Sequence, residues 1–137
     1  MAGVKKAWWF KPQRELKPGV PDSVKAGVER KCNELVETVL KPGHIKPLPE
    51  DKRFNYLVDI YTKWYRNYFY FCAKYCSPHP DAISPFVEDK FARLEYAGED
   101  RFNLSYMRHT GQWFEIFSEI TLEECIEAIK EMPHFMP

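Results

Sequence analysis

The sequence lacks an excess of charge of either sign. Its 137 residues include 20 Lys and Arg and 20 Asp and Glu. A neutral chain does not create the overall field expected of a nucleic-acid binder or of a protein that binds anionic membranes. The charge is unevenly distributed, because residues 1–53 carry a net charge of +5 and residues 85–137 carry −6. Such asymmetry can serve head-to-tail association, but in most proteins it only reflects solvated surfaces.

Long apolar runs are also missing. No stretch approaches the roughly twenty apolar residues that span a bilayer, and the cluster at 7–10 (Ala-Trp-Trp-Phe) is shorter than the apolar region of a signal peptide. The chain has only four cysteines, and Cys32 and Cys125 fall on apolar helix faces. They are typical of small buried hydrophobic residues in a reducing compartment. We therefore expect a cytoplasmic protein that does not need disulfides, although the sequence does not exclude them.

The sequence contains none of the common catalytic signatures. It has no Ser-His-Asp signature, no glycine-rich phosphate loop and no H-E-x-x-H motif. His109 beside Arg108 is the best candidate for acid–base chemistry, with Asp59, Glu115 and Glu119 as possible partners, but such chemistry requires groups that converge in a cleft. We expect a binding module rather than an enzyme, and a small enzyme with a site near His109 is the alternative.

No complete metal-binding motif is present either. Cys72, Cys76 and His79, with His109 as a conceivable fourth ligand, come nearest to a zinc site. A structural zinc site usually needs a second closely spaced pair of ligands, which this spacing lacks. We predict no metal and no cofactor.

Aromatic residues are abundant. The chain has four Trp, eight Tyr and ten Phe, and side chains of this kind favour strands and large buried cores. The length is that of one domain. Three prolines among scattered lysines predict an extended arm over residues 1–21, whose aromatic cluster at 8–10 could pack on the domain or on a second subunit. The single domain then comprises residues 22–137.

Two segments have the spacing of amphipathic helices. The first begins at an N-cap supplied by Asp22 or Ser23 and continues at three- and four-residue apolar spacing to Leu40, where 41–43 (Lys-Pro-Gly) ends it. The second begins at the capping box formed by Thr121 and Glu124 and ends before Pro133.

Between the helices, five strands are predicted, at 54–61, 68–75, 89–96, 101–108 and 112–117. Alternating apolar residues indicate the first and the fourth, and 68–75 is almost wholly aromatic or small. Residues 62–67 are expected to form the hinge between the first two strands. Consecutive strands with short connections pair antiparallel, and the two helices can cover one face of the sheet. The predicted fold is α+β: an N-terminal helix, a five-stranded antiparallel meander and a short C-terminal helix on one sheet face.

The order of these elements and their aromatic positions resemble a family of small bacterial proteins known only as a domain of unknown function. The resemblance covers roughly Val24 to Phe135. It rests on the segments 64–67 (Trp-Tyr-Arg-Asn), 90–94 (Lys-Phe-Ala-Arg-Leu), 102–108 (Phe-Asn-Leu-Ser-Tyr-Met-Arg) and 111–113 (Gly-Gln-Trp). The arm and the segment 76–85 depart from the pattern. The resemblance implies a fold and no activity.

More large rings are present than one covered sheet face needs, and arginine together with Trp and Tyr is typical of interface hot spots. The predicted binding residues are Trp64, Tyr65, Arg66, Tyr68, Tyr70, Arg108, His109 and Trp113. We expect self-association, such as a homodimer, through the arm or the free sheet face, or a protein partner, and no membrane contact. Arg66 and the aromatic second strand also leave weak binding of single-stranded nucleic acid as an alternative, although the neutral charge argues against it.

Overall fold

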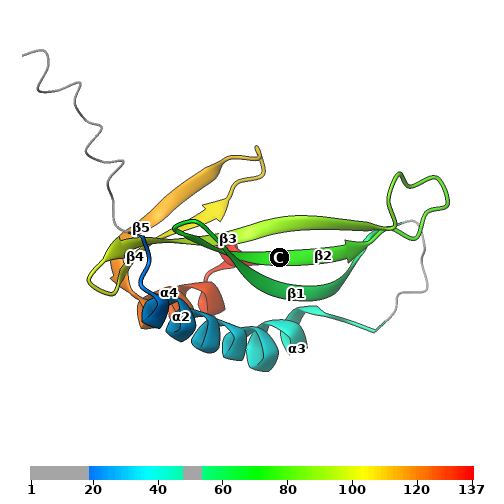
Figure 1. Ribbon diagram of the computed structural model, residues 1–137. Helices are drawn as coiled ribbons and strands as arrows, with labels where there is room; N and C mark the ends of the chain where they lie inside the picture. Colours follow the sequence, from blue (N-terminus) through cyan, green and yellow to red (C-terminus); the bar gives the residue numbers. More distant parts are fainter. Residues whose placement is uncertain (1–18, 48–53) are drawn as a thin grey trace, which may run out of the picture.

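The computed structural model describes residues 19–47 and 54–137, in which helices lie under one face of a five-stranded sheet (Figure 1). All neighbouring strands are antiparallel and follow chain order across the sheet. The strands are β1 (Tyr56–Tyr65), β2 (Tyr68–Cys76), β3 (Phe86–Gly98), β4 (Arg101–Met107) and β5 (Trp113–Thr121). The predicted α+β meander is confirmed. The predicted arm lies largely outside the described residues, and its aromatic cluster at 8–10 lies wholly outside them.

The first helix is longer than predicted. It comprises α2 (Asp22–Leu35), the π-helical turn η2 (Val36–Leu40) and α3 (Lys41–His44), which follow one another without a break. The prediction that 41–43 ends the helix was wrong. A proline ring crowds the carbonyl four residues before it in a regular α-helix. Here the Lys41 N–H donates to the Val36 carbonyl five residues back, and this wider turn precedes Pro42.

The second helix begins at the predicted capping box. α4 (Leu122–Glu131) starts where the Glu124 N–H donates to Thr121 Oγ1 over 3.1 Å and the Thr121 N–H donates to Glu124 Oε1 over 2.9 Å. The bond from the Thr121 backbone lowers the pKa of Glu124. A short 3₁₀ turn, η3 (Pro133–Phe135), follows and buries Phe135. Two free backbone amides at the helix start are thereby satisfied.

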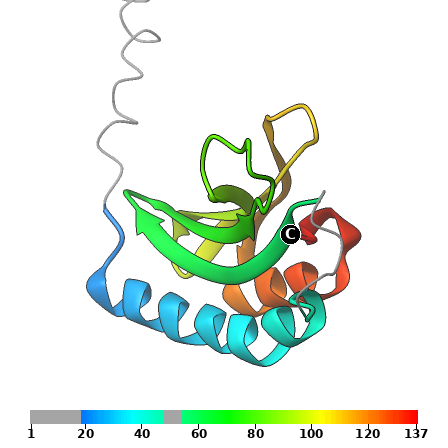
Figure 2. The same ribbon diagram turned by 90° about the vertical axis from the view of Figure 1, so that its right-hand side faces the viewer.

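The core lies between the helices and the sheet, and Figure 2 shows both helices under the same sheet face. Alternation along β2 directs Phe69 and Phe71 into this core, and both are fully buried. Cys32 from α2 and Cys125 from α4 are also fully buried, as predicted, and both are free thiols. The opposite surface of the sheet, called here the outer face, carries no helix from the described ranges 19–47 and 54–137.

The connection between β1 and β2 is shorter than predicted. Residues 62–65 continue β1, and the turn consists of Arg66 and Asn67 alone. Arg66 adopts the left-handed conformation with φ 56°, which glycine usually provides. Two-residue turns are usually recognised in a sequence by glycine, and this turn contains none, so the sequence did not indicate it.

Two other strands extend past their predicted ends. β3 begins at Phe86 instead of residue 89 and ends at Gly98. β5 continues from the predicted end at 117 to Thr121 through an irregularity at Glu119, where φ is 52° and the N–H donates to Asn103 Oδ1 over 2.8 Å. Bulges of this kind interrupt strict alternation, which is why the pattern ended early.

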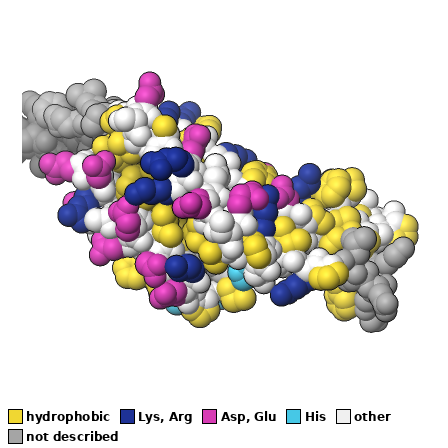
Figure 3. All heavy atoms as spheres, turned by 90° about the horizontal axis from the view of Figure 1, so that it is seen from below, with side chains coloured by type: hydrophobic (Ala, Val, Ile, Leu, Met, Phe, Trp, Pro, Cys, Tyr) yellow, Lys and Arg dark blue, Asp and Glu magenta, His cyan; other side chains and the backbone are white. Residues whose placement is uncertain are grey.

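The helix side of the molecule carries interspersed acidic and basic side chains (Figure 3). Lys31 of α2 forms an ion pair with Glu123 of α4 there. Exposed pairs of this kind contribute little to stability, and a mixed surface is typical of solvated helices. Within residues 19–47 and 54–137, no helix has both the length and the apolar character that crossing a membrane requires.

Candidate functional site

A group of aromatic and cationic side chains gathers on the outer face of the sheet. Because Phe69 and Phe71 point into the core, their neighbours Tyr68 and Tyr70 point to the outer face. The strand register places Tyr70 opposite Arg93 of β3. Five side chains form this group, which we call the aromatic–cation cluster: Tyr68, Tyr70, Lys90, Arg93 and Trp113.

The guanidinium of Arg93 lies at the centre of the cluster. Its Cζ is 4.5 Å from the ring centroid of Tyr68 and 4.8 Å from that of Trp113. The Tyr70 and Trp113 ring centroids are 5.9 Å apart, and Lys90 Nζ lies 5.6 Å from the Tyr70 centroid. Cation–π contacts with two rings limit the orientations that the guanidinium can adopt. Arg93 is therefore positioned before any ligand arrives.

The charges around the cluster are unequally paired. Lys63 and Lys90 both reach Glu88 Oε1, at 3.1 and 3.4 Å. Arg93 forms no ion pair with any carboxylate in the part of the chain that the structure describes, and its Nε is buried without a hydrogen-bond partner. Across the strand pair, Arg93 faces Ser105, which is only 2% exposed. Among the described residues, Arg93 thus lacks the direct carboxylate contact that Lys90 makes with Glu88.

Tyr65 and Arg66 lie at the tip of the β1–β2 hairpin. Arg66 Cζ is 5.2 Å from the Tyr65 ring centroid, and Tyr65 is 56% exposed. The register pairs Tyr65 with Tyr68, so this tip adjoins the aromatic–cation cluster. The structure therefore brings Tyr65, Tyr68, Tyr70 and Trp113 to one face.

Trp64 lies on the opposite side of the sheet. Its ring packs 5.0 Å from that of Phe69, against the core, with Lys25 Nζ of α2 5.9 Å from its centroid. Its Nε1 is buried and finds no hydrogen-bond acceptor among the described residues. The expectation that Trp64 shares a binding surface with Tyr65 fails because β1 continues past residue 61 and its side chains keep alternating.

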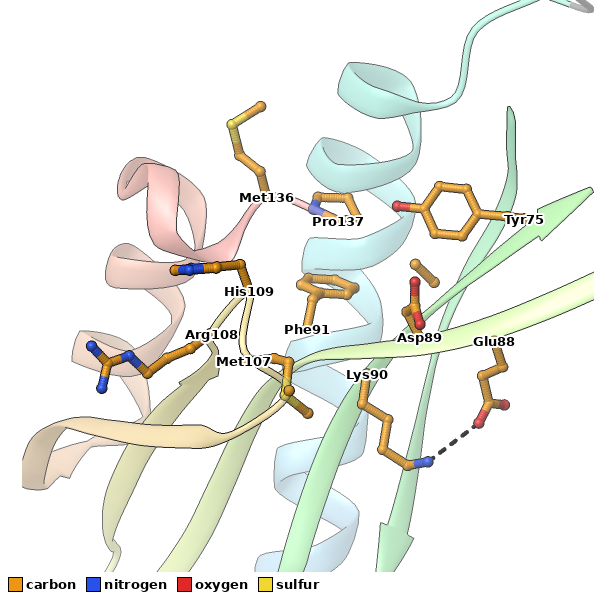
Figure 4. Close-up of a pocket in the computed structure, with 12 residues that line it drawn as sticks. Tyr75, Glu88, Asp89, Lys90, Phe91, Met107, Arg108, His109, Met136 and Pro137 are labelled. Atoms are coloured by element: carbon orange, nitrogen blue, oxygen red, sulfur yellow. Dashed lines mark hydrogen bonds and ion pairs between the residues drawn. The ribbon is translucent and has the colours of Figure 1, made fainter. Parts of the chain in front are cut away.

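Arg108 and His109 lie at the β4–β5 turn. Arg108 Cζ is 5.2 Å from the Phe114 centroid, and both predicted residues line a groove beside β3 (Figure 4). His109 forms no hydrogen bond or ion pair with a carboxylate of the described chain. The geometry therefore offers no partner for the acid–base role considered for His109.

The cysteine and histidine residues considered for zinc do not form a site. Within the described ranges, no group of three or more His, Cys, Asp or Glu side chains could hold a metal ion. Burial raises the pKa of Cys72, which disfavours the thiolate that zinc requires.

Two cluster residues, Lys90 and Arg93, were not among the predicted binding residues. They are three positions apart, so strict alternation would place them on opposite faces of the sheet. The register shifts between Phe71 and Cys72, where β3 inserts Phe91 as an extra residue. This bulge brings both cations to the outer face, and no period in the sequence indicates it.

No curated protein and no solved structure matches this chain. One family model does match, that of the Domain of unknown function (DUF3024), over residues 20–137. The match includes every helix and strand of the described residues and agrees with the resemblance noted from the sequence. The chain therefore belongs to the DUF3024 family of domains of unknown function.

Proposed function

We propose that this domain is a binding module whose aromatic–cation cluster recognises an anionic oxygen group of a partner. The observation that carries the proposal is the Arg93 guanidinium, held between two rings and without a carboxylate partner in the described chain. A half-buried cation without a counter-charge gains when a ligand supplies one. Carboxylate and phosphate oxygens both fit the fork of a guanidinium.

Two sources of that oxygen group are distinguished by the surrounding rings. A nucleic acid would stack its bases on exposed ring faces. Cations already contact the rings of Tyr68, Tyr70 and Trp113, so base stacking would compete with these contacts. An acidic segment of a protein needs no free ring face and is the source that we favour.

Binding of two fluorescent probes tests this proposal: a hexaglutamate peptide and a single-stranded oligouridine, each titrated at low salt. We expect Arg93→Gln to weaken peptide binding by at least tenfold, because a hydrogen bond to a charged group contributes about 1.5–3 kcal/mol. Arg93→Lys should weaken it less, because the charge remains and the fork is lost. Oligouridine binding should be weaker than peptide binding at the same salt.

Arg101→Gln is the matched control, since Arg101 is an exposed arginine of β4 outside the cluster. We expect it to change peptide affinity less than threefold. Equal losses in both variants would mean non-specific attraction, and absence of binding by both probes would refute the proposal. Tighter binding of oligouridine, lost in Arg93→Gln, would instead favour the nucleic-acid alternative.

We also propose that the domain self-associates in a bacterial cytoplasm, through the free outer face or through the N-terminal arm. The outer face bears the exposed Tyr65, and the reduced cysteines are compatible with a reducing compartment. Light scattering after size exclusion should show a dimer of the full chain and a smaller species when residues 1–20 are deleted or Tyr65 is changed to Ser. A monomer in every case would contradict self-association.

A further inference from the structure

The first half of β3 has an edge that no described strand covers. β3 pairs with β2 from Phe86 to Glu95, but with β4 only from Ala92 onwards. β4 ends at Met107, and the β4–β5 hairpin diverges from β3 at that point (Figure 1). An uncovered edge presents backbone groups that can pair with another chain.

The hydrogen-bond pattern identifies the groups on this edge. The Ser77 N–H donates to the Pro85 carbonyl over 2.8 Å. In an antiparallel pair such bonds recur at every second residue, so Val87 and Asp89 bond to β2. Phe86, Glu88 and Lys90 then direct their N–H and C=O groups to the open edge.

Ser84 confirms this direction and ends the open edge on one side. Its hydroxyl donates a hydrogen bond to the Phe86 carbonyl over 2.9 Å. The same Oγ accepts a hydrogen bond from the Phe86 N–H over 3.4 Å. The two backbone groups of Phe86 are therefore already occupied. Glu88 and Lys90 remain, one two-residue strand repeat apart.

A groove of about 560 Å³ lies along this edge (Figure 4). The β4–β5 turn, including Arg108 and His109, forms one wall. On the helix side of the sheet, the side chains of Tyr75, Asp89 and Phe91 face the C-terminal Met136 and Pro137. The side chains of Glu88 and Lys90 point to the opposite face. We call this feature the edge groove.

We propose that the edge groove binds an extended peptide segment of a partner protein, which adds a short strand of about four residues to β3. Alternating N–H and C=O groups at strand spacing are matched only by another extended backbone. This site goes beyond the anion-binding function proposed above, because it uses backbone groups of β3 and does not involve Arg93.

The side chains that line the groove indicate the type of peptide residue that would bind on the helix side of the sheet. Tyr75 and Phe91 provide aromatic walls, and Asp89 contributes a carboxylate that forms no ion pair or hydrogen bond within the described chain. A large apolar ring with one donor satisfies both requirements, so Trp or Tyr is expected there. Burial and Asp89 raise the pKa of the Tyr75 hydroxyl, which therefore stays protonated.

A second folded copy of this chain fits the groove less well. The open edge lies between the β4–β5 turn, which lines the groove, and Ser84, which occupies the backbone groups of Phe86. A second copy would have to bring its own edge, flanked by the same two segments, to Glu88 and Lys90. A flexible peptide has no such flanking segments to place.

The test uses linear eight-residue peptides selected from a phage-displayed random library on the full chain. A selected peptide is then synthesised and its affinity measured for the unchanged chain, Glu88→Pro and Glu88→Ala. Both substitutions remove the same carboxylate, but only proline removes the N–H at the open edge. Proline is tolerated at an edge position that donates no ladder bond. We expect Glu88→Pro to weaken binding at least tenfold, Glu88→Ala and Arg93→Gln less than threefold, and the selected peptides to be enriched in Trp or Tyr.

Several results would overturn the proposal: no peptide enriched above the unselected library, equal affinities for Glu88→Pro and Glu88→Ala, or a dimer of the full chain that Glu88→Pro dissociates. If Glu88→Pro fails to fold, amide hydrogen exchange of the unchanged chain, with and without the peptide, tests strand addition instead. Exchange of the Glu88 and Lys90 amides should slow at least tenfold on adding the peptide, and unchanged exchange would exclude strand addition. Loss of hexaglutamate binding in Arg93→Gln, with peptide binding retained, separates this site from the aromatic–cation cluster.

Discussion

Phe71→Ala is expected to lower the free energy of unfolding by about 3–5 kcal/mol. The Phe71 ring is fully buried in the middle of β2. It lies 5.8 Å from the Phe69 centroid and 6.0 Å from that of Phe91. Removal of the ring loses its burial and leaves a cavity that a rigid sheet cannot close. Urea denaturation followed by circular dichroism measures the loss.

Phe86→Ala is the matched control for this substitution. It makes the same chemical change in the neighbouring strand, but Phe86 is 47% exposed and its ring contacts Lys74, whose Nζ is 4.4 Å from the centroid. We expect a loss of no more than about 1 kcal/mol. Comparable losses for the two variants would contradict the placement of the core under β2.

The free energy of unfolding should also fall as the pH rises above about 9, because two thiols are buried between the helices and the sheet. Burial raises the pKa of Cys125 to about 12, with Glu124 and Glu123 adding to the shift. Burial, and then Cys125, raise the pKa of Cys32 still further. Above the unfolded pKa of about 8.5, the unfolded chain ionises these thiols and the folded chain does not. The contribution of these thiols to the free energy of unfolding is therefore fully present below the unfolded pKa. It is lost as the pH rises from there towards the pKa values of the thiols in the folded protein.

Each thiol can contribute a loss of up to about 1.4 kcal/mol per pH unit in this window. Denaturation of the Cys32→Ala, Cys125→Ala double variant between pH 8 and 11 should therefore show a shallower decline than that of the unchanged chain. Val28→Ala is the control, because Val28 is a buried residue of α2 without a titratable group, and its decline with pH should match that of the unchanged chain. A double variant with the original slope would show that these thiols do not titrate differently on folding.

Much of the fold is determined by local patterns. The apolar spacing from Val24 to Leu40 requires a helix with one buried face, and the hydroxyl of Thr121 with the carboxylate of Glu124 closes the start of α4 whatever surrounds it. Alternation in 101–107 likewise separates the residues of the two strand faces, whereas 68–75, almost wholly aromatic or small, indicates a strand without showing which residues face the helices. These features depend on neighbours within a few residues, so the sequence alone was sufficient for them.

Other features arose only from contacts between distant segments. The Phe91 bulge, which brings Lys90 and Arg93 to one face, lies within the pairing of β3 with β2 and directly before the residue where pairing with β4 begins. By contrast, the π-helical turn before Pro42 is a local feature, although the apolar spacing does not record it.

The candidate sites show the same division. The sequence by itself determined that Tyr68 and Tyr70 lie on the face opposite Phe69, because alternation along a strand is a local property. Only the tertiary structure decided that Arg93 lies between Tyr68 and Trp113, that Trp64 packs towards α2, and that β4 ends before it covers β3. These arrangements depend on strand register and strand length, which long-range pairing sets and no local period records.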